Sequence, residues 1–137
     1  MLAWLCEKTT GVDDLVRREI AIPVPGPEEV LIEIEAASLN FPDLLIIQNK
    51  YQQKPPLPFV PGAEFAGIIR ALGTDVKHLR VGARVACLNG TGGFASHTIA
   101  PAKLCLPLSD QFTPEDGASF IMTYATSHHA VKVGDFL

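Results

Sequence analysis

The sequence predicts a mainly β fold, a barrel or sandwich of short strands that also contains two short-to-medium helices. The clearest strand covers residues 29–39, where Val30, Ile32 and Ile34 are separated by residues such as Glu33, and this period of two places one face on a core. Shorter runs of the same character follow at close spacing, separated by glycine and proline, over residues 1–6, 15–22, 64–72, 84–88, 95–100 and 103–106. Short strands at such spacing are typical of a barrel or sandwich. Apolar residues make up 47% of the 137-residue chain and charged residues 19%, as expected of one globular domain with a core.

The first helix is predicted over residues 40–48, where the strand pattern stops. Asn40 can cap a helix, Pro42 suits the first helical turn, and Asp43 complements the positive end of the helix dipole. Asn49 stands where the helix must end, and asparagine tolerates the left-handed conformation found at such ends. A short helix is therefore expected between two strands.

The second helix is predicted to begin at Thr113 and Pro114 and to continue to Gly134. A capping residue, a proline and two acids open this segment, and apolar residues then follow along one helical stripe. Between the two helices, residues 54–62 carry four prolines that fix an extended path unsuited to the centre of a sheet. We expect that segment to be a rigid brace.

A glycine-rich segment at residues 90–95 loosely matches the dinucleotide-binding fingerprint. That fingerprint requires a helix immediately after it, whose N-terminus is aimed at the pyrophosphate. Here residues 94–100 alternate like a strand and then meet Pro101. The segment is therefore predicted to be a hairpin turn and not a nucleotide site.

Composition and motifs argue against several classes of function. The net charge is −4 and no basic run occurs, which argues against a nucleic-acid partner. Residues 1–6 are too short for a signal peptide or membrane span, so no membrane partner is expected. Cys6, Cys87 and Cys105 each lie in an apolar run, as in a protein of the reducing cytoplasm. Neither metal-ligand spacing nor a nucleophile elbow is present.

The chain resembles the quinone oxidoreductase (zeta-crystallin-like) branch of the medium-chain dehydrogenase/reductase family. The resemblance is carried by residues 39–43, Tyr51 and residues 54–67, with supporting matches at residues 81–85, 92–95 and 122–130. It implies a GroES-like, partly open β-barrel that a Rossmann domain follows. Residues 1–112 then form the barrel, residues 113–137 form a helix leading toward the nucleotide-binding domain, and that Rossmann domain is absent from this chain.

The same resemblance implies an enzyme without zinc. Zinc-dependent relatives carry a cysteine three residues before the Asp and a histidine directly before the Glu, and these positions are Asn40 and Ala63 here. A quinone or conjugated enone is already electrophilic, so its reduction does not need a Lewis acid as a simple ketone does. The expected activity of the parent enzyme is hydride transfer from NADPH to a small-molecule quinone or enone, with no metal-ligating residue.

By the resemblance, Asn40 and Asp43 are candidate catalytic residues in a cleft, and Asn40 and Thr126 contact the nicotinamide end of the cofactor. The residues alone also allow simple helix capping for Asn40 and a surface acid for Asp43. Glu64 is expected to support the neighbouring backbone and to do no chemistry.

Tyr51 is the third catalytic candidate and belongs to an alternative function. The run that ends at Tyr51 also resembles the enoyl thioester reductase branch, where a tyrosine at this place donates a proton to the enolate. A tyrosine after a short helix can equally be a packing residue with its hydroxyl at the rim.

Further expectations concern the whole protein. The resemblance implies a homodimeric, cytoplasmic parent. Since the nucleotide-binding domain is expected beyond Leu137, the 137-residue chain by itself is predicted to be inactive. A chain that naturally ended there would instead be a non-enzymatic GroES-like binding or interaction module.

Overall fold

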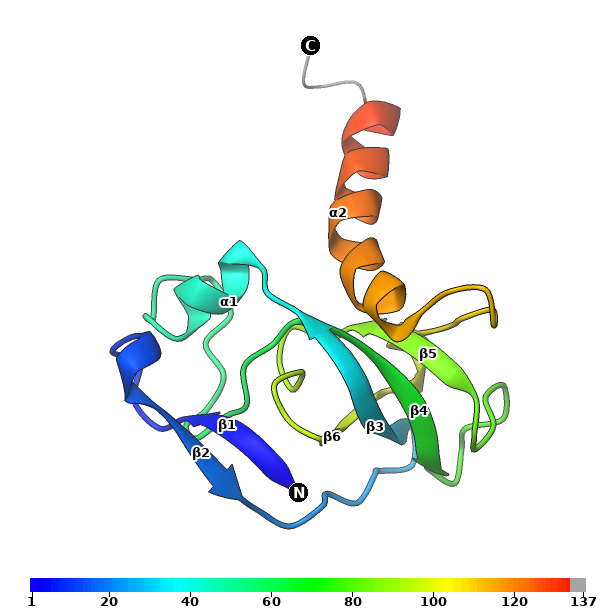
Figure 1. The fold of residues 1–137 in the computed structure, drawn as a ribbon, viewed down its shortest axis with the longest axis horizontal. Coiled ribbons are helices and arrows are strands. Elements are labelled where there is room, and N and C mark those ends of the chain that lie inside the picture. The colour runs from blue at the N-terminus through cyan, green and yellow to red at the C-terminus, as the bar shows by residue number, and fades with distance from the viewer. Residues whose placement is uncertain (134–137) are drawn as a thin grey trace.

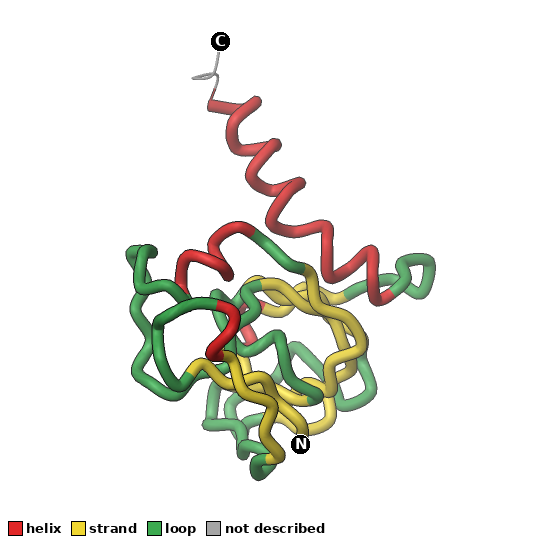
Figure 2. The backbone as a smooth tube through the Cα atoms, turned by 60° about the vertical axis from the view of Figure 1, so that its left-hand side comes forward, coloured by secondary structure: helices red, strands yellow, loops and turns green. Residues whose placement is uncertain are grey.

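The strands form a curled five-stranded sheet and a separate two-stranded sheet. The computed structural model describes residues 1–133, with the side chains of residues 1–121, Thr123 and Ser127. The strands are β1 (Leu2–Cys6), β2 (Leu15–Glu19), β3 (Glu29–Ser38), β4 (Glu64–Leu72), β5 (Arg84–Leu88), β6 (His97–Pro101) and β7 (Cys105–Pro107). The large sheet has the order β6-β3-β4-β5-β7, β1 pairs with β2, and every pair is antiparallel. Figures 1 and 2 show the strands curling round a common interior, which confirms the predicted partly open barrel.

The core fills the interior of the large sheet and follows from strand alternation. In β3, Val30 and Ile32 are fully buried, while Glu33 on the other face reaches solvent and pairs with Arg70 of β4 at 2.6 Å. Inward residues of the other strands complete the main core cluster, among them Phe65, Ile69, Val85, Cys87, Ala100 and Cys105. Burial of these side chains stabilises the fold at about 25 cal/mol per Å² of apolar surface.

Two helices lie at one end of this barrel (Figures 1 and 2). The short helix α1 (Phe41–Ile46) confirms the first prediction, and Asn49 just beyond it has the expected positive φ of 58°. The helix α2 (Pro114–Val133) starts where predicted, while its expected end at Gly134 lies outside the described residues. Two single 3-10 turns, Val12–Asp14 and Ala102–Leu104, join strands that are consecutive in the sequence: β1 to β2 and β6 to β7.

The first turns of α2 pack on the outer face of the sheet through small residues. Ala118 is buried against Ala66 of β4 and Ala86 of β5. Gly117 approaches so closely that an added Cβ would lie 3.2 Å from the Ala66 Cβ and 2.5 Å from a methyl of Leu108. Small residues thus let the helix lie directly on the strands. The predicted boundary between residues 112 and 113 falls just before this helix and stays a prediction.

The predicted hairpin turn at residues 90–95 is wrong. β5 and β6 flank this segment, yet β3 and β4 lie between them in the sheet. The segment instead crosses to the residues before β4, where the N–H groups of Gly92, Gly93 and Phe94 donate to the carbonyls of Val60, Gly62 and Pro61 at 2.7–2.9 Å. Strand alternation reports which face is buried and does not report which strand is the neighbour. No helix follows the glycines, as expected.

The proline-rich segment of residues 54–62 connects the two sheets. Only Phe59 within it pairs with a strand, through the exchange of two backbone hydrogen bonds with Cys6 at 2.8 and 3.2 Å. This agrees with the predicted path outside the centre of a sheet, and the predicted rigidity of the segment stays a prediction. Within residues 1–133, none of the helices combines the length and apolarity needed to cross a membrane.

Candidate functional site

The candidate site lies at the corner where β3 ends and β4 begins. The two strands are antiparallel, so Ser38 at the end of β3 is opposite Glu64 at the start of β4. The chain leaves β3 through Leu39 and Asn40 and turns directly into α1. Two of the predicted site residues, Asn40 and Asp43, are therefore brought to the same corner.

Asp43 is buried and holds this corner together. Its side chain is 5% exposed, its Oδ2 accepts the backbone N–H of Asn40 at 2.8 Å, and its Oδ1 accepts that of Ala63 at 2.9 Å. Burial raises the pKa of the Asp43 carboxyl above its ordinary value and the Glu64 carboxylate adds to this, although the two backbone donors oppose it. The alternative of a surface acid is wrong for Asp43, because both carboxylate oxygens are occupied inside the protein.

Glu64 holds the side chain of Asn40 through a hydrogen bond. It is fully buried, and its Oε2 accepts the Ser38 hydroxyl at 3.0 Å and the Asn40 Nδ2–H at 3.3 Å. The Asn40 Nδ2 also donates to the Ser38 Oγ at 3.0 Å. Glu64 therefore orients the side-chain amide of Asn40, and the predicted support of the neighbouring backbone by Glu64 stays a prediction. Ser38 was missed, and only the register of β3 on β4 could have identified it.

An apolar cavity of about 260 Å³ adjoins this polar corner. Asn40 and Asp43 are its polar lining residues, and the rest of its wall is apolar: Val12, Leu15, Leu39, Leu44, Ile47, Pro61 and Phe94. Four of these residues, Val12, Leu15, Leu39 and Phe94, also line a larger groove of about 620 Å³. A cavity of this kind is largely apolar and has room for a small molecule beside Asn40.

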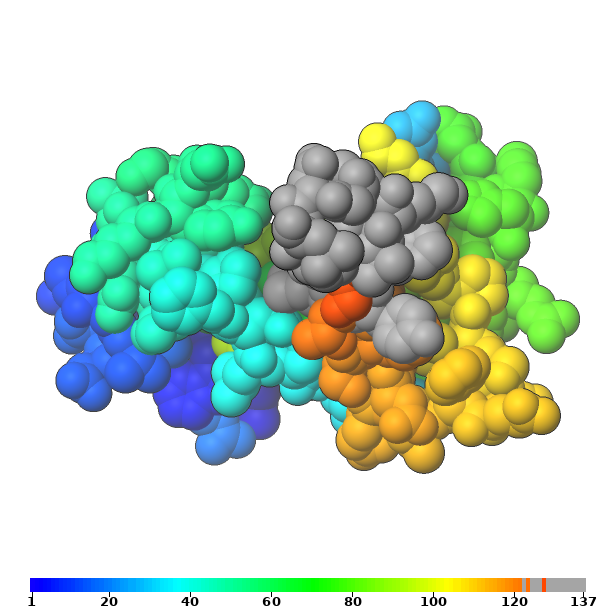
Figure 3. All heavy atoms as spheres, turned by 90° about the horizontal axis from the view of Figure 1, so that it is seen from above, coloured from blue at the N-terminus to red at the C-terminus, as the bar shows by residue number. Residues whose placement is uncertain are grey.

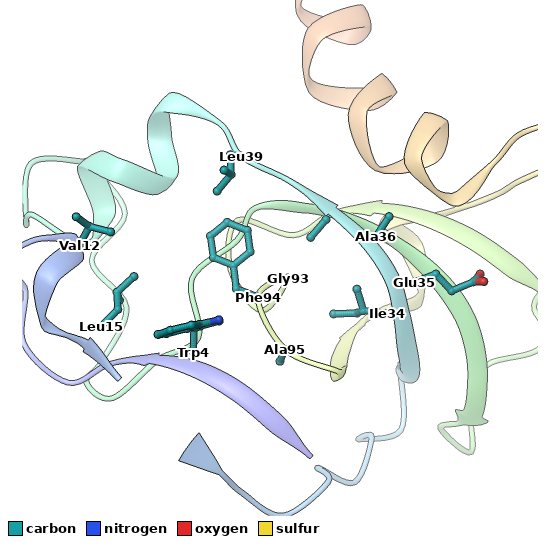
Figure 4. Close-up of a pocket in the computed structure, with 11 residues that line it drawn as sticks. Trp4, Val12, Leu15, Ile34, Glu35, Ala36, Leu39, Gly93, Phe94 and Ala95 are labelled. Atoms are coloured by element: carbon teal, nitrogen blue, oxygen red, sulfur yellow. The ribbon is translucent and has the colours of Figure 1, made fainter. Parts of the chain in front are cut away.

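The larger groove lies between the two sheets (Figure 4). Trp4 from β1, Ile34 and Ala36 from β3, and Phe94 from the crossing segment surround it. Trp4 is 48% exposed, and its backbone N–H donates to the Phe94 carbonyl at 2.9 Å, which ties β1 to the crossing segment. The roles of Trp4 and Phe94 in this groove could not be predicted from sequence, because the strand order that brings the two residues together is not encoded locally.

The remaining predicted site residues do not join this corner in the described part of the chain. Tyr51 packs against a second core cluster that contains Cys6, Ile46 and Phe59, and it does not line either cavity. Thr126 falls in α2, and its side chain lies outside the described residues. Figure 3 views the end of the barrel that carries α1 and the start of α2.

The residues at the corner are poor ligands for zinc. Zinc in proteins is bound mainly by thiolate, imidazole and carboxylate groups, and Asn40 and Ala63 supply an amide and a methyl group. Among the residues that the structure describes, no group of three or more His, Cys, Asp or Glu side chains could hold a metal ion. The nearby carboxylates of Asp43 and Glu64 are already engaged by the donors named above.

Comparison with curated proteins gives quinone oxidoreductase-like proteins and VAT-1 homologs among the relatives. Rat quinone oxidoreductase-like protein 2 is 31% identical over 143 aligned residues, which cover 94% of this chain and 41% of the relative. The human synaptic vesicle membrane protein VAT-1 homolog is 34% identical over 114 residues, which cover 83% of this chain and 29% of that protein. The chain thus spans well under half the length of these relatives.

Solved structures share the fold over nearly the whole chain. The quinone oxidoreductase of Thermus thermophilus, also solved as a complex with NADPH, superimposes with a TM-score of 0.81 at 30% identity, covering 99% of this chain and 41% of that one. The human VAT-1 homolog-like protein superimposes with a TM-score of 0.93 at 29% identity, covering 100% and 44%. Residues 26–110 match the alcohol dehydrogenase GroES-like domain. The chain therefore belongs to the alcohol dehydrogenase GroES-like domain family and corresponds to the N-terminal part of quinone oxidoreductase-like medium-chain dehydrogenases/reductases.

Proposed function

We propose that this domain forms the substrate side of an NADPH-dependent, zinc-independent reductase that transfers hydride to a quinone or conjugated enone. The observation that carries the proposal is the hydrogen-bonded chain Glu64–Ser38–Asn40, which orients the side-chain amide of Asn40, a residue that lines an apolar cavity. A bound nicotinamide would supply the hydride. Asn40 would meet the nicotinamide ribose and the substrate, and Thr126 would contact the nicotinamide end.

In this proposal the domain orients the Asn40 side chain and keeps water away from the reacting groups. Glu64 and Ser38 hold the Asn40 amide in one orientation, so that less ordering is needed when the ligands bind. Asp43 acts as a positioning residue, because its two hydrogen bonds fix Asn40 relative to Ala63. The apolar wall that includes Phe94 would exclude water from the nicotinamide and the substrate.

Other features support the expectations for the whole protein. The donor set supports the proposed substrate class, because Asn40 and Ala63 stand where zinc-dependent relatives carry ligands and a conjugated acceptor needs no Lewis acid. The three buried cysteines are unpaired, as in a reducing cytoplasm. A homodimeric parent remains part of the proposal, and sedimentation of the longer protein tests it.

The experiment is a chimaera in which residues 1–133 replace the corresponding part of mouse quinone oxidoreductase, which is 32% identical over 117 residues. We expect NADPH oxidation that depends on an added quinone and that a metal chelator does not reduce. Asn40→Ala should lower kcat by about 10–100-fold through lost positioning. Asn49→Gly is the matched control at the far end of α1, since glycine accepts the same positive φ, and it should leave turnover unchanged.

Three outcomes contradict parts of the proposal. Equal turnover of the Asn40→Ala and Asn49→Gly chimaeras would show that Asn40 has no role in turnover. Loss of turnover with the chelator would show that the reaction depends on a metal. A chimaera that folds but is inactive would indicate that this domain is a binding or interaction module. The 137-residue chain alone should not oxidise NADPH in the presence of a quinone.

Tyr51→Phe distinguishes quinone reduction from enoyl thioester reduction. The substitution keeps the ring that packs with Ile46 and Phe59 and removes only the hydroxyl. Quinone turnover by the chimaera should be unchanged. A loss confined to reduction of an enoyl thioester would instead assign Tyr51 as the proton donor.

A further inference from the structure

Cys87 and Cys105 lie directly opposite each other on β5 and β7. The ladder is fixed by the Leu108 N–H, which donates to the Arg84 carbonyl at 2.9 Å and makes Arg84 and Leu108 a hydrogen-bonded pair. Pairs alternate along an antiparallel ladder, so three steps further on Cys87 and Cys105 form a non-hydrogen-bonded pair. Side chains approach most closely in such pairs, where the Cα atoms are about 4.5 Å apart. That spacing falls at the short end of the range of about 4.4–6.8 Å that a disulfide spans.

The two thiols share a buried environment and have unequal proton affinities. Both belong to the main core cluster, and Cys87 is 0% exposed and Cys105 5%. The Cys105 thiol donates to the Pro101 carbonyl at 3.5 Å. A hydrogen bond with Cys105, together with burial, raises the pKa of the Cys87 thiol, and the same hydrogen bond lowers the pKa of Cys105. Cys105 is therefore the first of the two to become a thiolate.

The position of β7 gives a route to Cys105. β7 has three residues, lies at the edge of the sheet and pairs only with β5. Leu106 and Pro107 beside the thiol are exposed, and Pro107 has no N–H to donate to the ladder. Short edge strands open locally at a much lower free energy than the whole fold. Local opening of β7 would expose Cys105 while the other strands of the sheet stay paired.

We infer that Cys87 and Cys105 are a peroxide-oxidisable dithiol that closes to an intrachain disulfide between β5 and β7. The Cys105 thiolate attacks a peroxide oxygen, so an S–O bond forms, the O–O bond breaks and hydroxide leaves a sulfenic acid behind. The Cys87 sulfur then attacks that sulfur and gives up its proton as the S–S bond forms, the S–O bond breaks and a second hydroxide leaves. The two thiol protons convert both hydroxides to water, so two thiols are oxidised and one peroxide is reduced.

The disulfide would act on the connection between the barrel and α2. β7 leads through Leu108 to the start of the helix, and Leu108 packs against the cluster that holds Ala118. A bond from Cys105 to Cys87 stops β7 from detaching and so holds this connection in place. This inference does not depend on the proposed function.

The chain carries its own control in Cys6. It is also 0% exposed, and burial raises the pKa of its thiol, but that thiol donates to the Lys8 carbonyl at 3.2 Å and has no register partner that is a cysteine. Trypsin places the three cysteines on separate peptides, residues 1–8, 85–103 and 104–132. A disulfide between Cys87 and Cys105 is therefore read directly as a linked pair of peptides.

The test treats the purified chain with hydrogen peroxide, unfolds it in an alkylating agent and maps the peptides by mass spectrometry without reduction. We expect peptides 85–103 and 104–132 to be linked with the loss of two hydrogen atoms, and dithiothreitol to reverse this. The link should form about tenfold faster than the Cys6 thiol is lost. Cys6→Ala should keep the link, and Cys105→Ala should abolish it and leave Cys87 as a thiol.

The wild-type map decides the question even if Cys105→Ala does not fold. Loss of all three thiols at one rate, or conversion of Cys105 to a sulfinic acid without a link, overturns the inference. Links between two molecules, which dilution of the protein would reduce, also overturn it. A rise in the thermal midpoint after peroxide treatment that Cys6→Ala retains would add support.

Discussion

The strongest test of the corner is the comparison of two carboxylates that make the same local hydrogen bond. Asp43 accepts the backbone N–H of Asn40 at 2.8 Å, and Asp116 accepts that of Thr113 at 3.2 Å, in each case three residues back at a helix start. The Asp116 bond is exposed to solvent, whereas Asp43 is 5% exposed and also accepts the N–H of Ala63. The two sites therefore share the capping interaction and differ in burial and in the second bond.

Asp43→Ala leaves two N–H groups without their acceptor at a site that water cannot easily reach. Each buried donor that loses its partner costs about 1–3 kcal/mol, which gives about 2–6 kcal/mol for the pair. Relief of the desolvation of a buried carboxylate offsets part of this, so we expect a loss of about 2–4 kcal/mol in the free energy of unfolding. Asp116→Ala should lose only about 0.5–1 kcal/mol, because water replaces the lost acceptor.

The assay is urea unfolding followed by the fluorescence of Trp4, the single tryptophan of the chain. The midpoint should fall for Asp43→Ala at an unchanged slope, since the slope reports the surface exposed on unfolding. Circular dichroism of the same samples checks that the fold is retained. Equal losses for the two variants would refute the reasoning, because burial of the Asp43 carboxylate would then contribute nothing.

Three further predictions follow from the same contacts. Because burial raises the pKa of Asp43 above its ordinary 3.8, the folded chain binds the proton more tightly, so the stability of wild type relative to Asp43→Asn should fall as pH rises through the raised pKa in urea titrations. Gly67→Ala should lower the free energy of unfolding by about 3 kcal/mol or prevent folding, because the new Cβ would lie 2.1 Å from the Glu33 carbonyl oxygen of β3. Gly82→Ala, where φ is 91° and the space around the new Cβ is open, should lower it by only about 1–2 kcal/mol. Thermal melts of the two variants check this difference. In the active chimaera, Phe94→Ala should raise KM for a quinone more than it lowers kcat, and a fall in kcat at an unchanged KM would instead show that Phe94 acts on the reaction itself.

The start of α1 could be predicted from sequence because its signals are local. Asn40, Pro42 and Asp43 lie within one helical turn, and each has a preference that acts through neighbouring backbone groups. The burial of Asp43 could not be predicted in this way. Its second partner, Ala63, lies 20 residues further along the chain, and only the pairing of β3 with β4 brings the two together.

The wrong hairpin at residues 90–95 and the unforeseen Cys87–Cys105 pair have one cause. Alternation shows that Cys87 faces a core, but a hairpin would have made β6 the neighbour of β5, whereas β5 lies between β4 and β7. The crossing segment that replaces the hairpin carries Phe94 to the cavity beside Asn40. Strand order, which sequence patterns do not encode locally, therefore decides both the wall of the candidate site and the partner of the thiol. Substitutions in the crossing segment should accordingly disturb the cavity more than the Cys87–Cys105 pair, whose register depends only on β5 and β7.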